Sequence, residues 1–191
     1  AVQVSGKKPF ISRPAVHNLA RPSGLRRPLH IPNPFSYYQL AELLVGNWSR
    51  IDQHIRKSRL SVSVPVEDAD QKRALIPASE GTKLNPQRAK TRSAAKFLLR
   101  TDVARFYSSL YTHSIPLALD GKDVAKQQGA GGLGNDLDRV VRNMQDGQTL
   151  GIPIGPDASF ILGEIIASVV DRRLSKLRYS GLRFMDDYEL V

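Results

Sequence analysis

The sequence predicts an α+β protein, with helices and short strands interspersed along one chain of 191 residues. Three observations support this class. Residues 60–66 alternate between apolar and polar, as in a half-exposed strand. The apolar runs 97–103 and 182–191 are short enough to be strands. Apolar residues recur every three or four positions, as on one face of a helix, in residues 36–58, 135–147 and 156–177.

The first 35 residues are expected to form an extended basic arm. Six prolines lie between Pro9 and Pro34, and Arg and Lys are frequent. This composition is typical of extended chain rather than of packed structure. Such an arm could lie on nucleic acid or on a partner subunit, and a loosely ordered tail is an equally good interpretation.

Residues 36–96 form the second predicted region. We expect a helix over 36–58, a strand at 60–66 and a further short strand at 72–76. The stretch 79–96 is polar and basic, which favours a hairpin or a loop.

Residues 97–191 form the third predicted region. The run 97–103 is interpreted as a buried strand with Asp102 near its end, followed by a helix or turn over 106–111. A Gly- and Lys-rich connection is expected over 120–134. It is followed by two predicted helices, 135–147 and 156–177, and by a terminal hairpin over 182–191.

Net charge is the unusual feature of the composition. Lys and Arg total 28 against 18 acidic residues, which gives a formal charge of +10. A domain this basic usually meets a polyanion, although a solvated basic surface is the plain alternative. The chain has no cysteine, which excludes disulfides, zinc ribbons and thiol nucleophiles. No apolar run reaches the roughly 20 residues that span a bilayer, so no membrane partner is expected.

Three aspartates stand out by their context. Asp102 ends one predicted strand, while Asp186 and Asp187 lie at or near the turn of the predicted hairpin. A sheet could bring the two places together, and clustered carboxylates are costly unless cations neutralise them. Oxygen ligands favour Mg²⁺, and a pair of such ions can activate a 3′-hydroxyl and stabilise a leaving pyrophosphate. Taken singly, each aspartate could equally be turn or helix-cap chemistry.

Three sequence motifs resemble those of reverse transcriptases, in the order that this family shows. Asp102-x-x-x-Phe106-Tyr107-x-Ser109 resembles motif A, and Gly151-x-Pro153-x-Gly155-x-x-x-Ser159 resembles motif B. Phe184-Met185-Asp186-Asp187 resembles motif C. The resemblance covers residues 36–191. It implies fingers in residues 36–96 and a polymerase palm, with an antiparallel sheet and packed helices, in residues 97–191. The thumb of the family is expected to be absent from this chain.

The resemblance also implies a metal site. Asp102 and Asp186 correspond to the principal ligands of two Mg²⁺ ions, with Mn²⁺ as an alternative. Asp187 completes the carboxylate group, and the backbone carbonyl of Val103 is a further expected ligand.

A nucleotide-binding set is implied as well. Tyr107 falls where an aromatic residue blocks a nucleotide 2′-hydroxyl, which would favour deoxynucleotides; a buried core aromatic is the alternative. Gly151, Pro153 and Gly155 would let the backbone approach the templating base and the incoming nucleotide, unless they form a plain loop before a helix.

Three arginines of the predicted fingers are expected to bind the triphosphate, because Arg can grip phosphate through two nitrogens. They are Arg73, Arg88 and Arg92. Otherwise they are solvated charges or contacts to a duplex backbone.

The residues around the motifs further resemble bacterial abortive-infection and other defence-associated reverse transcriptases, in 106–116, 145–149 and 151–156. This resemblance implies a cytoplasmic bacterial enzyme of antiphage defence. Its partners would be deoxynucleoside triphosphates and an RNA template or RNA/DNA duplex, with a homo-oligomer or further domains also consistent. We expect weak or no processive synthesis by these 191 residues alone.

Three other functions stay open at this point. Template-independent DNA synthesis would use the same site. An RNA-dependent RNA polymerase is disfavoured by Tyr107, and a non-catalytic RNA-binding palm-like module is disfavoured by the three aspartates.

Overall fold

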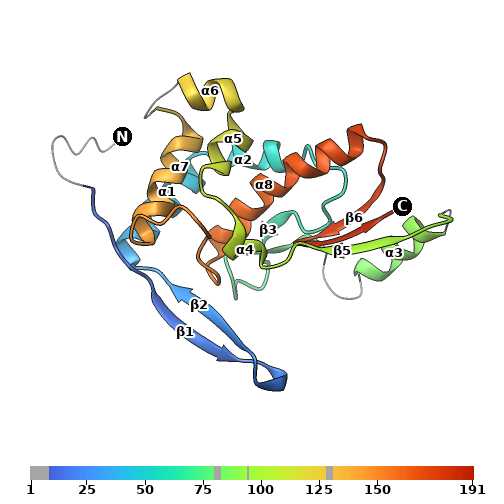
Figure 1. The fold of residues 1–191 in the computed structure, drawn as a ribbon, viewed down its shortest axis with the longest axis horizontal. Helices are drawn as coiled ribbons and strands as arrows, with labels where there is room; N and C mark the ends of the chain where they lie inside the picture. The colour runs from blue at the N-terminus through green and yellow to red at the C-terminus, as the bar shows by residue number, and fades with distance from the viewer. Residues whose placement is uncertain (1–8, 80–82, 94, 128–130) are drawn as a thin grey trace.

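The structure is a computed structural model that describes residues 9–79, 83–93, 95–127 and 131–191. In this part of the chain it contains eight α-helices and three small antiparallel sheets, which confirms the predicted α+β class. Most of the helices gather at one side and around one long central helix, while a three-stranded sheet and one further helix lie at the other side (Figure 1).

Five helices share the main core: α1 (Pro34–Gly46), α2 (Trp48–Ile55), α5 (Ser114–Leu119), α7 (Leu133–Met144) and α8 (Asp157–Lys176). Their apolar faces meet through fully buried side chains, each of which contributes about 1.5–3 kcal/mol by leaving water. Among these side chains are Leu40, Ile51, Ile55, Ile115, Leu137, Val141, Leu162 and Ile165.

The single helix expected over 36–58 is in fact two helices. Asn47 ends α1, and its side-chain amide donates to the carbonyl of Leu43 at 2.9 Å. An Asn side chain that bonds the backbone locally competes with the continuing helix, which explains the break.

The three-stranded sheet has the order β5 (Leu99–Asp102), β7 (Asp187–Leu190), β6 (Gly181–Phe184), with both pairs antiparallel. The terminal hairpin is therefore confirmed. The chain at Leu60 extends the sheet, because its carbonyl accepts from the Arg183 N–H at 2.6 Å. Helix α8 covers one face, where Leu174 packs on Tyr188 and Leu190.

The expectation of a buried strand at 97–103 is wrong. All four residues of β5 are exposed, and 56% of Leu99 is accessible. The reason is positional: β5 is an edge strand that bonds only to β7.

The region 60–96 differs from expectation in two further ways. The strand expected at 60–66 begins only at Pro65, and β3 (Pro65–Glu67) pairs with β4 (Leu75–Pro77). Part of the expected loop at 79–96 is the helix α3 (Leu84–Arg92), whose sequence is rich in helix-favouring residues. Leu84 is buried and anchors this helix. Residues 80–82 and 94 lie outside the described part.

The connection expected at 120–134 contains the short helix α6 (Lys122–Gln127), and residues 128–130 lie outside the described part. The motif around Phe106 forms the one-turn helix α4 (Phe106–Ser109). Both helices are short, and neither showed a clear period in the sequence.

The N-terminal arm, which was expected to be extended, is a β-hairpin of two extended strands. Strand β1 (Ala15–Ala20) pairs with β2 (Arg26–Ile31), and the 3₁₀ turn η1 (Pro22–Gly24) closes the tip, where Gly24 has φ +73°. The hairpin projects from the body (Figure 1). No described helix is long and apolar enough to cross a membrane.

Candidate active site

The structure brings the three aspartates together at one end of the sheet. Asp102, the last residue of β5, lies directly opposite Asp187, the first residue of β7. Asp186 occupies the turn before β7, and its carbonyl accepts from the Val103 N–H at 3.1 Å. Opposite residues of an antiparallel pair project to the same face, about 4.5–5.5 Å apart at Cα. The Asp102 and Asp187 side chains therefore share a face.

The charges of these residues act on each other. Burial raises the pKa of Asp186, a hydrogen bond from its own backbone lowers it, and the charges of Asp187 and Asp102 raise it again. The net result is a pKa of Asp186 above its ordinary value, because burial and, after it, the neighbouring like charges disfavour ionisation. A cation at this point would relieve the repulsion.

The donor set suits a hard cation. Three carboxylates and the nearby Val103 backbone offer only oxygen ligands, which is what Mg²⁺ prefers. Among the described residues, no three His, Cys, Asp or Glu side chains are arranged to hold a metal ion as they stand. Asp102 and Asp187 are exposed, so their carboxylates are free to turn toward a bound ion.

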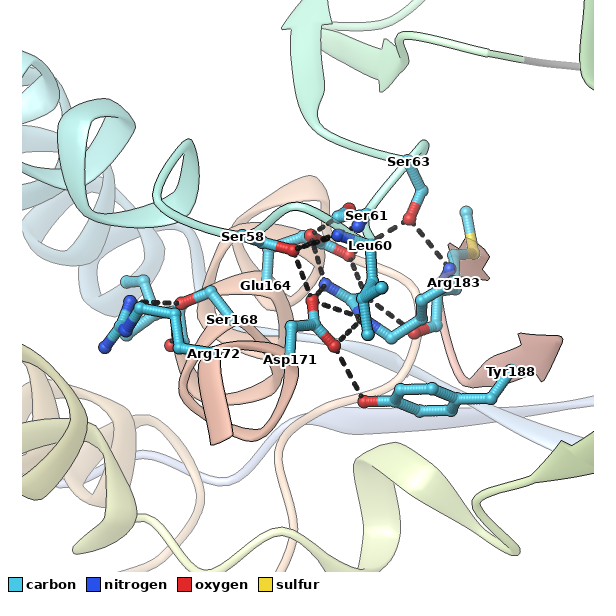
Figure 2. Close-up of polar contacts among 12 residues, drawn as sticks. Ser58, Leu60, Ser61, Ser63, Glu164, Ser168, Asp171, Arg172, Arg183 and Tyr188 are labelled. Atoms are coloured by element: carbon cyan, nitrogen blue, oxygen red, sulfur yellow. Dashed lines mark hydrogen bonds and ion pairs between the residues drawn. The ribbon is translucent and has the colours of Figure 1, made fainter. Parts of the chain in front are cut away.

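A buried ion cluster lies behind the aspartates, on the opposite face of the sheet. Arg183 of β6 is fully buried between Glu164 and Asp171 of α8 (Figure 2). Its Nε and Nη2 donate to Asp171 at 2.8–3.0 Å, and Nη1 and Nη2 donate to Glu164 at 2.6 and 2.9 Å. Burial lowers the pKa of Arg183, but the hydrogen bonds and charges of the two carboxylates raise it above its ordinary value.

The cluster also holds the turn that carries Asp186. Nη1 of Arg183 donates to the Met185 carbonyl at 2.7 Å, and the Ser63 hydroxyl accepts from the Met185 N–H at 2.7 Å. The same Ser63 hydroxyl donates to Glu164 at 3.1 Å, as Figure 2 shows. The carboxylate oxygens that accept from Arg183 also accept from the hydroxyls of Ser58, Ser61 and Tyr188. The turn before Asp187 is thus fixed to α8 through its backbone.

Tyr107 lies beside this turn. Its ring packs on Phe106, with ring centroids 5.1 Å apart, and against Gly163 of α8, where a Cβ would come within 3.2 Å of Tyr107 Cε1. Burial raises the pKa of Tyr107 to about 12, and the nearby charges of Glu164 and Asp186 add to this effect. The phenol is therefore neutral at physiological pH.

The loop 151–155 is fastened to α4. The Ile152 N–H donates to the Tyr107 carbonyl at 2.8 Å, and the Gly151 N–H donates to the Leu110 carbonyl at 2.7 Å. Gly151 and Gly155 have φ of +90° and +127°, which favour glycine. Pro153 lines a surface pocket between this loop and His30.

The three predicted phosphate-binding arginines are each paired with a carboxylate. Arg73 pairs with Asp157 at the start of α8. Arg88 and Arg92 of α3 reach the buried Glu189 at 2.9 and 2.6 Å.

Only one of these arginines lines the pocket beside the aspartates. Arg88 shares that pocket with Asp102, Asp187 and Arg100. Arg73 and Arg92 do not line it in the part of the chain that the structure describes.

Two features of the site were not predicted from the sequence. Arg27 of β2 lies close enough for its charge to lower the pKa of both Asp186 and Tyr107. The Arg183 cluster was also missed. Its signal was present, because Glu164 and Asp171 are seven residues apart on the otherwise uncharged buried face of α8.

In comparisons with known proteins, the sequence matches no protein-family model and no curated protein.

Proposed function

We propose that the chain is the catalytic part of an RNA-directed DNA polymerase, which extends a 3′-hydroxyl with deoxynucleotides. The observation that supports this most strongly is the pairing of Asp102 with Asp187 next to the Asp186 turn. Under this proposal the sheet β5–β7–β6 with α8 is the palm, and β3, β4 and α3 belong to the fingers.

The predicted metal ligands then have a defined task. Asp102, Asp186 and Asp187 would hold two Mg²⁺ ions, with the Val103 carbonyl as a further ligand. When bound, such ions supply charge neutralisation and a more acidic 3′-hydroxyl. The protein's own contribution is placement, because phosphoryl transfer needs in-line geometry and electrostatic stabilisation more than covalent chemistry.

Two groups would position the nucleotide. The neutral Tyr107 ring, held by Gly163 and Phe106, would contact the sugar where a 2′-hydroxyl would project. The backbone of the loop 151–155 would approach the base pair, since its two positive-φ glycines carry no side chain. Arg88, which lines the pocket beside Asp102 and Asp187, is the best placed arginine for the triphosphate, and it would have to exchange Glu189 for phosphate.

Incorporation of a single nucleotide tests the proposal. The 191-residue chain is mixed with a DNA primer annealed to RNA, Mg²⁺ and the complementary deoxynucleotide, and the primer length is read on a gel. We expect extension that is lost in Asp186→Ala and kept in Asp70→Ala, whose exposed carboxylate pairs with Lys72. Equal extension by both variants, or binding of RNA with no extension by the unmodified chain, would contradict the proposal. Omitting the template distinguishes templated from untemplated synthesis.

A non-catalytic RNA-binding module is the second candidate. The observation that favours it is the formal charge of +10, which suits binding of a polyanion with or without catalysis. Heat denaturation with and without Mg²⁺ separates the two candidates. A metal site raises the melting temperature with Mg²⁺ concentration, and this rise should disappear in Asp186→Ala.

A further inference from the structure

The N-terminal segment carries more than half of the net charge of the chain. Residues 1–41 contain six Lys or Arg and no acidic residue, and the first carboxylate is that of Glu42. The segment therefore contributes +6 of the total +10. Such one-signed segments attract polyanions and repel other cations.

The hairpin β1–β2 carries three of these six cations, Arg21, Arg26 and Arg27, outside the body of the protein. All six residues of β1 are exposed, so the hairpin is not held by burial of its own side chains. A two-stranded hairpin is only marginally stable by itself. It is fastened at its base, where the Ser12 N–H donates to Asn143 and the Asp146 N–H donates to Ser12, both at 2.8 Å.

The base of the hairpin also bonds to the loop 151–155. The His30 N–H donates to the Ile154 carbonyl at 2.7 Å, and the Ile154 N–H donates to His30 Nδ1 at 3.1 Å. A Cβ on Gly155 would come within 3.5 Å of the His30 carbonyl, so the two backbones are in close contact. The hairpin thus begins beside the loop 151–155, and Arg27 lies near enough to Asp186 for the two charges to interact.

Three arginines of the distal half have no ion pair within the described residues. Arg27 lies opposite Leu19, Arg26 lies opposite Ala20, and Arg21 follows at the tip. Arg26 donates only to the backbone carbonyl of Asn18, at 3.4 Å. Arg13, by contrast, is at the base and pairs with Asp146. Exposed guanidinium groups without a carboxylate partner suit phosphate, which they can bind through two parallel hydrogen bonds.

We propose that the β1–β2 hairpin is a nucleic-acid contact in which Arg21, Arg26 and Arg27 bind the phosphates of one RNA strand. Such contacts position a strand without reading its sequence. The direction of the hairpin places that strand on a path to the loop 151–155. That the strand is the template of synthesis rests on the proposed function, whereas the contact itself does not.

A second copy of this chain is the competing occupant. Val16, Leu25 and Ile31 of the hairpin are more than half exposed, and apolar exposure can mark a protein contact. A contact between two hairpins, however, would bring two acid-free segments of charge +3 together. The charges therefore favour a polyanion over a second hairpin.

Fluorescence anisotropy with a labelled single-stranded RNA tests the proposal. The hairpin variant combines Arg21→Ala, Arg26→Ala and Arg27→Ala. The control is a second triple variant, which removes the same charge from exposed positions on α6, α7 and α8 by combining Lys122→Ala, Arg139→Ala and Arg173→Ala. Each phosphate contact to a single strand contributes about 0.7 to the salt slope of log K, so the hairpin variant should lose about 2. Its affinity should fall on the order of tenfold to a hundredfold at 0.1 M salt, against a small change in the control.

Further variants make the outcome decisive. Replacing the three arginines by lysine should restore most of the affinity, and circular dichroism should show unchanged melting for all three variants. Asp186→Ala should bind RNA as the unmodified chain does, so that a failed polymerase assay leaves this test intact. Equal weakening in both triple variants would overturn the proposal. Unchanged RNA affinity of the hairpin variant would also overturn it, if sedimentation shows that the unmodified chain is a dimer and that only the hairpin variant is a monomer.

Discussion

Arg183 donates two parallel hydrogen bonds to the buried carboxylate of Glu164, which lies 19 residues earlier in the chain. All five N–H donors of the guanidinium are satisfied, by Glu164, Asp171 and the Met185 carbonyl. A single buried cation therefore joins strand β6, helix α8 and the turn that leads to Asp186. The position of Asp186 and Asp187 therefore depends on a buried cluster on the opposite face of the sheet.

Removing that cation should unfold much of the molecule. Arg183→Met leaves two buried carboxylates without a counter-charge, and breaking a buried pair in this way costs about 3–5 kcal/mol. Urea denaturation measures the loss. Arg56→Ala, which removes an exposed pair with Asp52, should cost less than about 1 kcal/mol. A loss for Arg183→Met as small as that of the control would contradict the role assigned to the cluster.

Relieving the repulsion between Asp102 and Asp187 should stabilise the metal-free protein. Like charges directly opposite in a sheet destabilise it by about 0.2–1 kcal/mol, so Asp102→Asn should raise the free energy of unfolding in EDTA by that order. The same change should reduce the stabilisation that Mg²⁺ confers. Asp70→Asn, on an exposed side chain, serves as the control. A loss of stability in EDTA would argue against close carboxylates.

Adding a methyl group at Gly181 should be strongly destabilising. Gly181 has φ +147°, and a Cβ there would lie 2.0 Å from the carbonyl oxygen of Glu189. We expect Gly181→Ala to cost more than about 2 kcal/mol in denaturant unfolding, because conformational strain and a backbone clash add. Gly147→Ala tests strain alone, since φ is +75° and nothing lies within 4 Å. It should cost about 1–2 kcal/mol.

Acid should destabilise the fold partly through His54. The pKa of His54 lies below its ordinary value, mainly because the ring is buried. A hydrogen bond with the Ile165 carbonyl raises the pKa, and the charge of Arg172 lowers it. Below the ordinary pKa of 6.5 the unfolded chain binds a proton that the folded chain does not, so stability falls as pH drops from 6.5 toward the lower folded pKa.

Urea unfolding between pH 7.5 and pH 5 measures this dependence. The slope of stability against pH should be smaller in His54→Gln, whose amide can still donate to Ile165 but does not titrate. His17→Gln, in the exposed strand β1, should keep the slope of the unmodified chain. Identical slopes in all three proteins would exclude His54 as the titrating group.

If the chain is a DNA polymerase, Tyr107 should select the sugar. Tyr107→Ala should raise the use of ribonucleotides relative to deoxynucleotides by on the order of tenfold, because a ring that fills the space of the 2′-hydroxyl is removed. The measurement is single-nucleotide incorporation with each nucleotide in turn. Tyr111→Ala, at a half-exposed ring outside the site, is the matched control. An unchanged ratio in Tyr107→Ala would remove the selecting role from this residue.

The sequence by itself determined the α+β class, the long helix after Pro156 and the terminal hairpin, because these follow from contacts between near neighbours. A period of two or of 3.6 residues records which face of an element is buried. The sequence also marked Asp102, Asp186 and Asp187, since strand ends and turns are local features. The register of β5 on β7 then placed Asp102 opposite Asp187.

Only the tertiary structure decided which charges are paired. Arg73 and Arg92 bind carboxylates 84 and 97 residues away, Arg183 is buried although it belongs to a charged residue type, and Arg27 approaches Asp186 from the N-terminal hairpin. The physical reason is that an ion pair depends on distance in space, and an arginine carries no local signal of the carboxylate that it will meet. For the same reason the exposure of β5 was missed, because burial depends on what packs over a strand.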